Sequence, residues 1–209
     1  MKKRENYIAI FNKYVPEEFS PILADLLLGT AISFKVVKGR KTKLGDFRLN
    51  HLRENPVITV NGDLNPYSFL ITSLHEFAHY FTFQKYGTKV LPHGEEWKEA
   101  YRKLILPVVM SGHLPKDIEE ALMQSLVKTK ASSCADINLS RILHAYNNSK
   151  TAGNKLEEIP KNTTFALNKR QFVKLNKRRT RYECKEVSTG RIFLVHALAI
   201  VTIIEENEE

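Results

Sequence analysis

The stretch Leu70–Trp97 constrains this chain most, because it carries four residues with the spacing of a metal site. His75, Glu76 and His79 form an H-E-x-x-H set, and His93 follows fourteen residues after His79. Residues four apart lie on one face of a helix, so His75 and His79 can direct two imidazoles at one point, as a tetrahedral zinc ion requires. Glu76 projects about 100° around the helix from His75 and can reach a metal-bound water without taking a coordination position.

The residues around this motif predict one long helix from Pro66 to about Tyr86. Asn65 is a favourable residue before the first turn, and Pro66 suits the first helical position. Gly87 is a typical helix end. Apolar side chains recur at helical spacing and indicate one buried stripe, formed by Leu70, Leu74, Phe77, Ala78 and Phe81.

The third ligand has several candidates. A metzincin pattern is excluded, because it needs glycine and histidine where this chain has Thr82 and Lys85. A thermolysin-like site would take a downstream glutamate, and the sequence offers Glu95, Glu96 and Glu99. His93 is the better candidate, because the proline before it and the glycine after it place it in a tight turn just before a predicted helix. His113 is the second choice.

The sequence HEFAHY, a loop and then PHGEEW resembles the SprT-like metalloprotease domain, the Spartan-related family that includes a DNA–protein crosslink protease. The resemblance implies one zinc ion held by His75, His79 and His93, with Glu76 as the general base. It also implies a zincin-like fold in which an edge strand above the metal helix pairs with an extended substrate. It covers the strands upstream of the motif, whereas residues 112–160 match no pattern of the family.

The order of helical and β-rich segments predicts an α+β fold. Residues 5–29 predict a helix pair, or one helix broken at Pro16. Further helices are expected over 95–110, 115–128 and 136–146. A small antiparallel sheet is expected from Ala31–Val37, Phe47–Leu49 and Pro56–Val60.

The domain organisation follows from composition. We expect a zincin-like metalloprotease domain at residues 1–146, a polar linker at 147–163 and a basic β-rich unit at 164–209. In SprT-like proteins the last position often holds a zinc ribbon with two cysteine pairs. This unit has only Cys184, so a four-cysteine site is impossible. We therefore expect a ribbon-like hairpin that has lost its metal, or an unrelated β appendage.

Most of the excess positive charge lies in this unit. Residues 161–191 hold ten Lys or Arg and two Glu, a net of +8 against +9 for the whole chain. Basic side chains beside aromatic ones suit single-stranded or junction DNA, whereas a solubilising surface or an acidic protein partner is the alternative. The candidate contacts are Lys41 and Lys43 in an upstream loop and Arg170, Lys174, Lys177, Arg178, Arg179 and Arg181.

The remaining features indicate a reducing, cytoplasmic environment. The basic start Met1–Arg4 is not followed by an apolar segment, which argues against a signal peptide. No apolar run approaches the about 18 residues that a membrane span needs. Cys134 and Cys184 lie far apart, which argues against a disulfide framework.

Together these features predict a zinc metallopeptidase that hydrolyses peptide bonds in proteins held near DNA. The alternative is a nucleic-acid-binding protein without catalysis, in which zinc is only a structural tie. Glu76 favours the enzyme, because a structural site needs no carboxylate beside the metal. A third hypothesis is a self-processing protease that trims its own segment 147–163.

Overall fold

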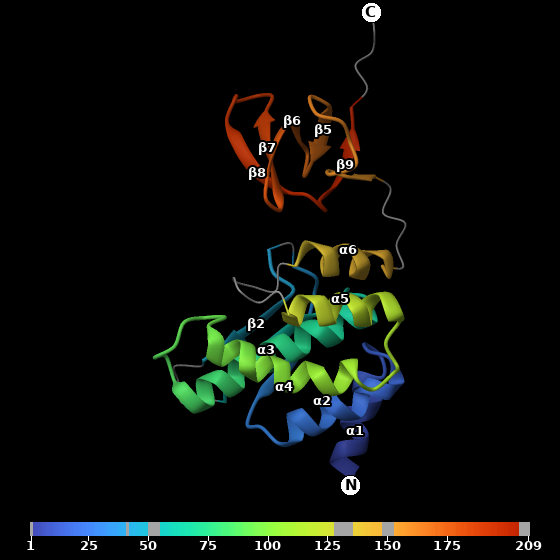
Figure 1. Ribbon diagram of the computed structural model, residues 1–209, viewed down its shortest axis with the longest axis vertical. Helices are drawn as coiled ribbons and strands as arrows, with labels where there is room; N and C mark the ends of the chain where they lie inside the picture. The colour runs from blue at the N-terminus through green and yellow to red at the C-terminus, as the bar shows by residue number, and fades with distance from the viewer. Residues whose placement is uncertain (1, 41, 50–54, 128–135, 148–152, 205–209) are drawn as a thin grey trace, which may run out of the picture. The chain divides into compact units, whose positions relative to one another are not determined.

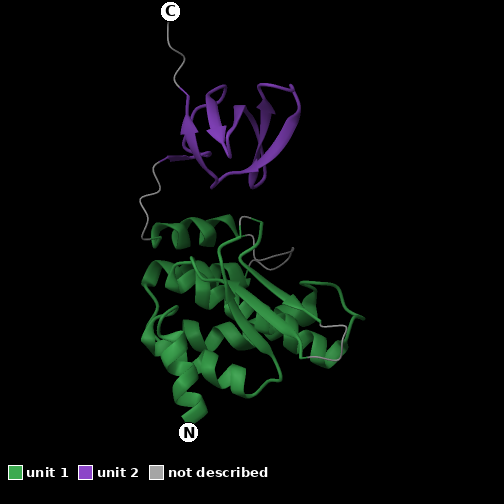
Figure 2. Cartoon of the chain, turned by 180° about the vertical axis from the view of Figure 1, so that it is seen from behind, with its two compact units in different colours: residues 1–148 green, residues 149–209 purple. Residues whose placement is uncertain are grey.

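The computed structural model describes residues 2–40, 42–49, 55–127, 136–147 and 153–204 (Figure 1). The chain has an α+β fold and divides into two units, residues 1–148 and 149–209 (Figure 2). Within the described ranges, no helix is both long and apolar enough to cross a membrane.

The described part of the first unit consists of six α-helices and a three-stranded sheet. The helices are α1 (Lys2–Phe11), α2 (Ser20–Leu28), α3 (Pro66–Tyr86), α4 (Glu95–Val109), α5 (Lys116–Val127) and α6 (Ile137–Ala145), with a 3-10 turn η1 (Glu17–Phe19). The strands are β1 (Ser33–Val37), β2 (Gly45–Arg48) and β3 (Val57–Asn61). The predicted break near Pro16 is confirmed, because α1 ends before it and η1 and α2 follow.

Helix α3 runs through the core of this unit, and the structure confirms both predicted ends. The Asn65 side-chain oxygen accepts a hydrogen bond from the Ser68 N–H at 2.9 Å. Gly87 ends the helix with φ of 62°, a backbone conformation that glycine adopts without steric cost. Phe69, Leu74 and Phe77 are fully buried along its length. The helix thus offers a rigid support for side chains on its remaining face.

The small sheet is mixed, so the prediction of an antiparallel sheet is wrong. The strand order is β1-β3-β2, with β1 parallel to β3 and β2 antiparallel to it. Strand β3 is the most buried of the three and takes the centre, where both faces are covered. The connection after β1 passes the position of β3 and leaves β2 at the edge. Hydrophobic patterning identifies strands but does not set this order.

The described part of the second unit, residues 153–204, is an antiparallel sheet of six strands in the order β4-β9-β5-β6-β7-β8. The strands are β4 (Asn154–Lys155), β5 (Thr164–Leu167), β6 (Arg170–Arg178), β7 (Arg181–Glu186), β8 (Ile192–His196) and β9 (Ile200–Ile203). Its core contains Phe165, Phe172 and Cys184, and burial raises the pKa of the Cys184 thiol to about 11. Gly190 lies in the turn between β7 and β8 and has φ of 70°.

The second unit begins earlier than its predicted start at residue 164. Strand β4 pairs with β9, and Leu156 and Ile159 are buried in the core of the unit. The predicted linker 147–163 therefore includes residues that belong to the second unit. The polar residues, Gly and Pro around Leu156 and Ile159 gave this segment the composition of a linker. Apolar side chains spaced three apart were the available signal.

Candidate metal centre

Three imidazoles converge on one point of the first unit. The Nε2 atoms of His79 and His75 are 3.1 Å apart, those of His79 and His93 are 3.1 Å apart, and those of His93 and His75 are 3.2 Å apart. Among the described residues, this is the group of side chains that could hold a metal ion. The structure thus brings together the three histidines that the sequence predicts as ligands.

Local structure explains the convergence. His75 and His79 are one turn apart on α3, so their rings project from the same face. His93 lies in the turn before α4, with φ of 61°, an uncommon conformation for a residue other than glycine. The Gly94 N–H donates to the Leu91 carbonyl at 2.9 Å and closes this turn. The turn directs the His93 ring back toward α3.

The donor set fits a tetrahedral zinc ion. Zinc–nitrogen bonds of about 2.05 Å at tetrahedral angles separate the nitrogens by about 3.3 Å, close to the observed spacing. Each neutral imidazole nitrogen carries either one N–H or one lone pair in the ring plane, so three such atoms cannot all satisfy one another. A cation at the shared point satisfies all three lone pairs.

Electrostatics keep these rings in the form that binds metal. Burial, and then the neighbouring His79 and His93, lower the pKa of His75 from 6.5 to about 3. Burial and His93 lower the pKa of His79 to about 4, and burial lowers that of His93. The imidazoles are therefore neutral near pH 7, as metal coordination requires.

The alternative third ligands lie elsewhere. His113 packs edge-on against Phe19, with ring centroids 6.4 Å apart. Glu95 is largely exposed and pairs with Lys98, and Glu99 pairs with Lys103, each at 2.7 Å. Neither these residues nor Glu96 belongs to the group of potential ligands.

Glu76 is buried on α3 under strand β2, with 6% of its surface exposed. The Phe47 N–H hydrogen-bonds the Glu76 carboxyl, and burial followed by the charge of Asp46 raises the pKa of Glu76 to about 7. Gly45 leaves the space that this carboxyl occupies, because a Cβ atom there would lie 2.6 Å from Glu76 Oε1. Sequence reasoning overlooked Gly45, since a glycine at the start of a strand resembles an ordinary turn residue.

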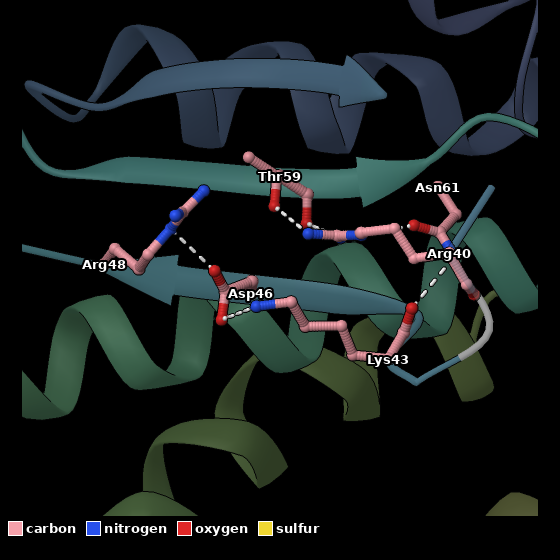
Figure 3. A network of polar contacts seen from close by, with 6 residues as sticks. All are labelled: Arg40, Lys43, Asp46, Arg48, Thr59 and Asn61. Carbon is pink, nitrogen blue, oxygen red and sulfur yellow. Dashed lines mark hydrogen bonds and ion pairs between the residues drawn. The ribbon is translucent and has the colours of Figure 1, made fainter. Parts of the chain in front are cut away.

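A polar network fixes β2 in this position (Figure 3). The Arg40 guanidinium donates to Asn61 Oδ1 at 2.8 Å and to Thr59 Oγ1 at 3.0 Å. Asn61 Nδ2 in turn donates to the Lys43 carbonyl at 2.9 Å. Asp46 pairs with the Lys43 and Arg48 side chains at 2.9 and 2.7 Å. The network ties the loop before β2 to the central strand β3.

Trp97 of α4 covers one side of the centre. Its ring centroid lies 4.7 Å from those of His75 and His93 and 5.3 Å from that of His79, and it stacks on Tyr101. Two hollows meet its surface, one lined by His75 and Glu76 and the other by His79 and His93. The centre therefore lies between two spaces that open along β2.

The predicted nucleic-acid contacts have different surroundings. Lys41 lies outside the described residues, and the Lys43 ammonium pairs with Asp46. Arg170 pairs with Glu186 and lies over the Phe172 and Phe193 rings.

Lys174 was predicted to contact nucleic acid, but the structure shows its side chain buried. It is 3% exposed, and its ammonium donates to the Ile159 carbonyl at 2.5 Å and lies 4.1 Å from the Tyr182 ring centroid. Burial lowers the pKa of Lys174. This side chain holds the start of the unit to β6 and is not available to a phosphate.

The other four predicted basic residues are exposed and cluster at the β6–β7 turn. Arg178 lies opposite Arg181 across the hairpin, and Lys177 pairs with Tyr182 in the ladder. Arg179 lies in the turn between the two strands, with φ of 49°. Arg178 also forms an ion pair with Glu183 at 2.8 Å.

The fold and the site define an α+β protein with a potential three-histidine metal centre. Comparisons with models of protein families, with curated proteins and with solved structures gave no significant match. The site geometry therefore carries the functional argument.

Proposed function

We propose that this protein is a zinc-dependent peptidase of the SprT-like type. The observation that carries the proposal is the convergence of three Nε2 atoms within 3.2 Å, beside the buried carboxyl of Glu76. Structural zinc sites use four protein ligands, whereas hydrolytic sites use three and leave one position open. The three-histidine group in the described residues supports the second class.

Glu76 has the properties of a general base. A zinc ion held by His75, His79 and His93 would acidify a water molecule and polarise a substrate carbonyl. The Glu76 carboxylate accepts the proton of the attacking water and later delivers it to the leaving amine. Without a bound metal, burial raises the pKa of Glu76 to about 7, and the positive charge of a bound metal would favour the carboxylate, the form that accepts a proton. The Phe47 N–H holds the carboxyl in place during this exchange.

Strand β2 supplies a binding surface for a peptide. It is one of the two edge strands of its sheet, and the two hollows beside the metal centre border it at Gly45 and Phe47. An extended peptide can add to such an edge through backbone hydrogen bonds. This arrangement supports an unfolded or extended protein segment as the substrate.

Contact with DNA is the second part of the proposal, and the exposed hairpin tip of the second unit supports it. Lys177, Arg178, Arg179 and Arg181 gather at one turn, where they can neutralise phosphates. The proposed substrates are therefore proteins bound or crosslinked to DNA. A protein that only binds nucleic acid remains the alternative function, with the same hairpin as its supporting feature.

The test compares wild type with Glu76→Gln on a DNA-bound protein, with and without single-stranded DNA. The glutamine variant should keep its zinc content and lose cleavage by about 10²–10⁴-fold, the usual contribution of a general base. Equal cleavage by the two proteins would refute the mechanism. Zinc binding without cleavage in either protein would favour the alternative function.

A further inference from the structure

A pocket of about 330 Å3 opens directly beside the candidate metal centre. His75 and Glu76 form part of its lining, and Gly45 borders it from β2. The other walls come from α3, α4, α5 and α6 and are largely apolar, with Ile71, Tyr101, Leu126, Leu139 and Leu143 among them. Two of these helices, α5 and α6, lie within residues 112–160, outside the segments that resemble SprT-like proteins.

The α6 wall of this pocket is anchored to α3 and α5. Asn65 Nδ2, at the start of α3, donates to the Leu143 carbonyl at 2.8 Å. Just after α6, the Tyr146 hydroxyl donates to Asp117 Oδ1 at 2.8 Å, and its ring packs edge-on against Tyr67. These contacts hold the pocket open without a ligand, as is common for specific binding sites.

The size and charge of the pocket favour a large apolar occupant. A cavity of about 150 Å3 is enough to hold a benzene ring, so this pocket has room for an aromatic side chain. Lys98 also lines the pocket, but its ammonium pairs with the Glu95 carboxylate at 2.7 Å. That ion pair weakens the attraction for an acidic occupant.

The position of the pocket along β2 indicates which substrate residue enters it. The pocket borders Gly45 at the start of β2, whereas the second hollow borders Phe47 near its end. Antiparallel pairing is the more stable arrangement for an added strand. A peptide paired in this way passes the second hollow first, then the metal centre, and reaches the pocket with the residues that follow the scissile bond.

We propose that this pocket binds the side chain immediately after the scissile bond and selects large apolar residues there, aromatic ones included. The inference rests on the proposed peptidase function. It assigns the choice of cleavage site to α5 and α6 as well as to the metal helix.

The test uses the zinc-loaded full-length chain and two peptides that differ only in phenylalanine or alanine after the cleaved bond. Unfolded casein, with cut sites identified by mass spectrometry, locates the preferred sequence first. Ser125→Trp narrows the pocket from α5, and Ser140→Phe narrows it from α6. Gln124→Trp is the matched control, because this exposed neighbour carries the same new ring outside the pocket.

Wild type and Gln124→Trp should favour the phenylalanine peptide at least about 10-fold in kcat/KM, a typical effect of an apolar pocket. Each narrowing variant should keep its zinc and lower kcat/KM for the phenylalanine peptide far more than for the alanine peptide, so that the preference is lost. Cleavage by wild type without the preference, or with acidic residues preferred, would overturn this inference and leave the peptidase function standing. Casein cleavage no greater than that of Glu76→Gln would overturn both.

Discussion

The substitution Gly45→Ala tests whether the packing of β2 on α3 positions Glu76. The new Cβ atom would lie 2.6 Å from Glu76 Oε1, 2.7 Å from Thr72 Cγ2 and 2.8 Å from Glu76 Cγ. All three distances are shorter than real Cβ contacts, so a neighbour must move. The Glu76 side chain is longer and has more rotatable bonds than that of Thr72, so its carboxyl is the group expected to shift.

The expected magnitude follows from the two consequences of this crowding. Overpacking by one methyl group costs about 1–3 kcal/mol of the free energy of unfolding. Displacing the general base should lower kcat/KM by about 10²-fold or more, within the usual contribution of such a group. The zinc content should stay at the wild-type level, because the three imidazoles are not in the contacts that Gly45→Ala disturbs.

Gly62→Ala is the matched control. Its Cβ atom would lie 2.8 Å from Val36 Cγ1 and 3.5 Å from the Val37 carbonyl oxygen, a milder crowding next to β3, with no Glu76 atom among the near neighbours. Urea denaturation, zinc content and peptidase kinetics are measured on both variants. Both variants should be destabilised, Gly62→Ala by less, and only Gly45→Ala should lose activity. Full activity in a folded Gly45→Ala protein would show that the position of Glu76 does not control the reaction.

Three further predictions concern the metal ligands and the second unit. His93→Ala should weaken zinc binding by more than about 100-fold, because losing a ligand costs more than losing a residue that only hydrogen-bonds to a ligand. Competition with a chromophoric chelator measures this affinity, and an unchanged value would show that His93 is not a ligand. In zinc-free protein, the free energy of unfolding, measured with urea, should fall as the pH drops from 7 toward 4. The pKa values of His75 and His79 are about 3 and about 4 in the folded state, so over this range the unfolded chain binds more protons than the folded protein. Glu76, with a pKa of about 7, binds a proton more readily in the folded protein and so partly offsets this loss of stability as the pH falls. Glu76→Gln should therefore make the loss steeper, and a free energy of unfolding that does not change with pH would contradict these pKa shifts. Lys174→Met should destabilise the second unit by about 1–3 kcal/mol, because it removes the donor to the Ile159 carbonyl. Its affinity for single-stranded DNA, measured by fluorescence anisotropy, should stay unchanged.

The sequence predicted α3 and the convergence of the three ligands because these features depend on local rules. Caps fix the ends of the helix, a four-residue spacing fixes two rings, and a turn between proline and glycine directs His93. The order of strands in the small sheet depends on long-range packing, which alternation does not encode. The burial of Lys174 was equally hidden, because its partners are backbone carbonyls fifteen or more residues away.

The pocket beside Glu76 illustrates a further limit of sequence reasoning. Its walls combine residues from four helices, and the contact that anchors α6 joins Asn65 to the Leu143 carbonyl, 78 residues later. Asn65 was predicted only as a helix cap, a role that its side-chain oxygen does fill. Its amide nitrogen has the second role, and no local pattern indicates it.

The most direct test of the central claim is zinc X-ray absorption spectroscopy on the full-length protein, with the zinc content measured on the same sample. The account predicts one zinc per chain with three imidazole nitrogens and one oxygen, all at about 2.0–2.1 Å. His79→Ala should abolish this signal. A zinc ion with sulfur or with four protein nitrogens as ligands, or a signal that survives His79→Ala, would contradict the account.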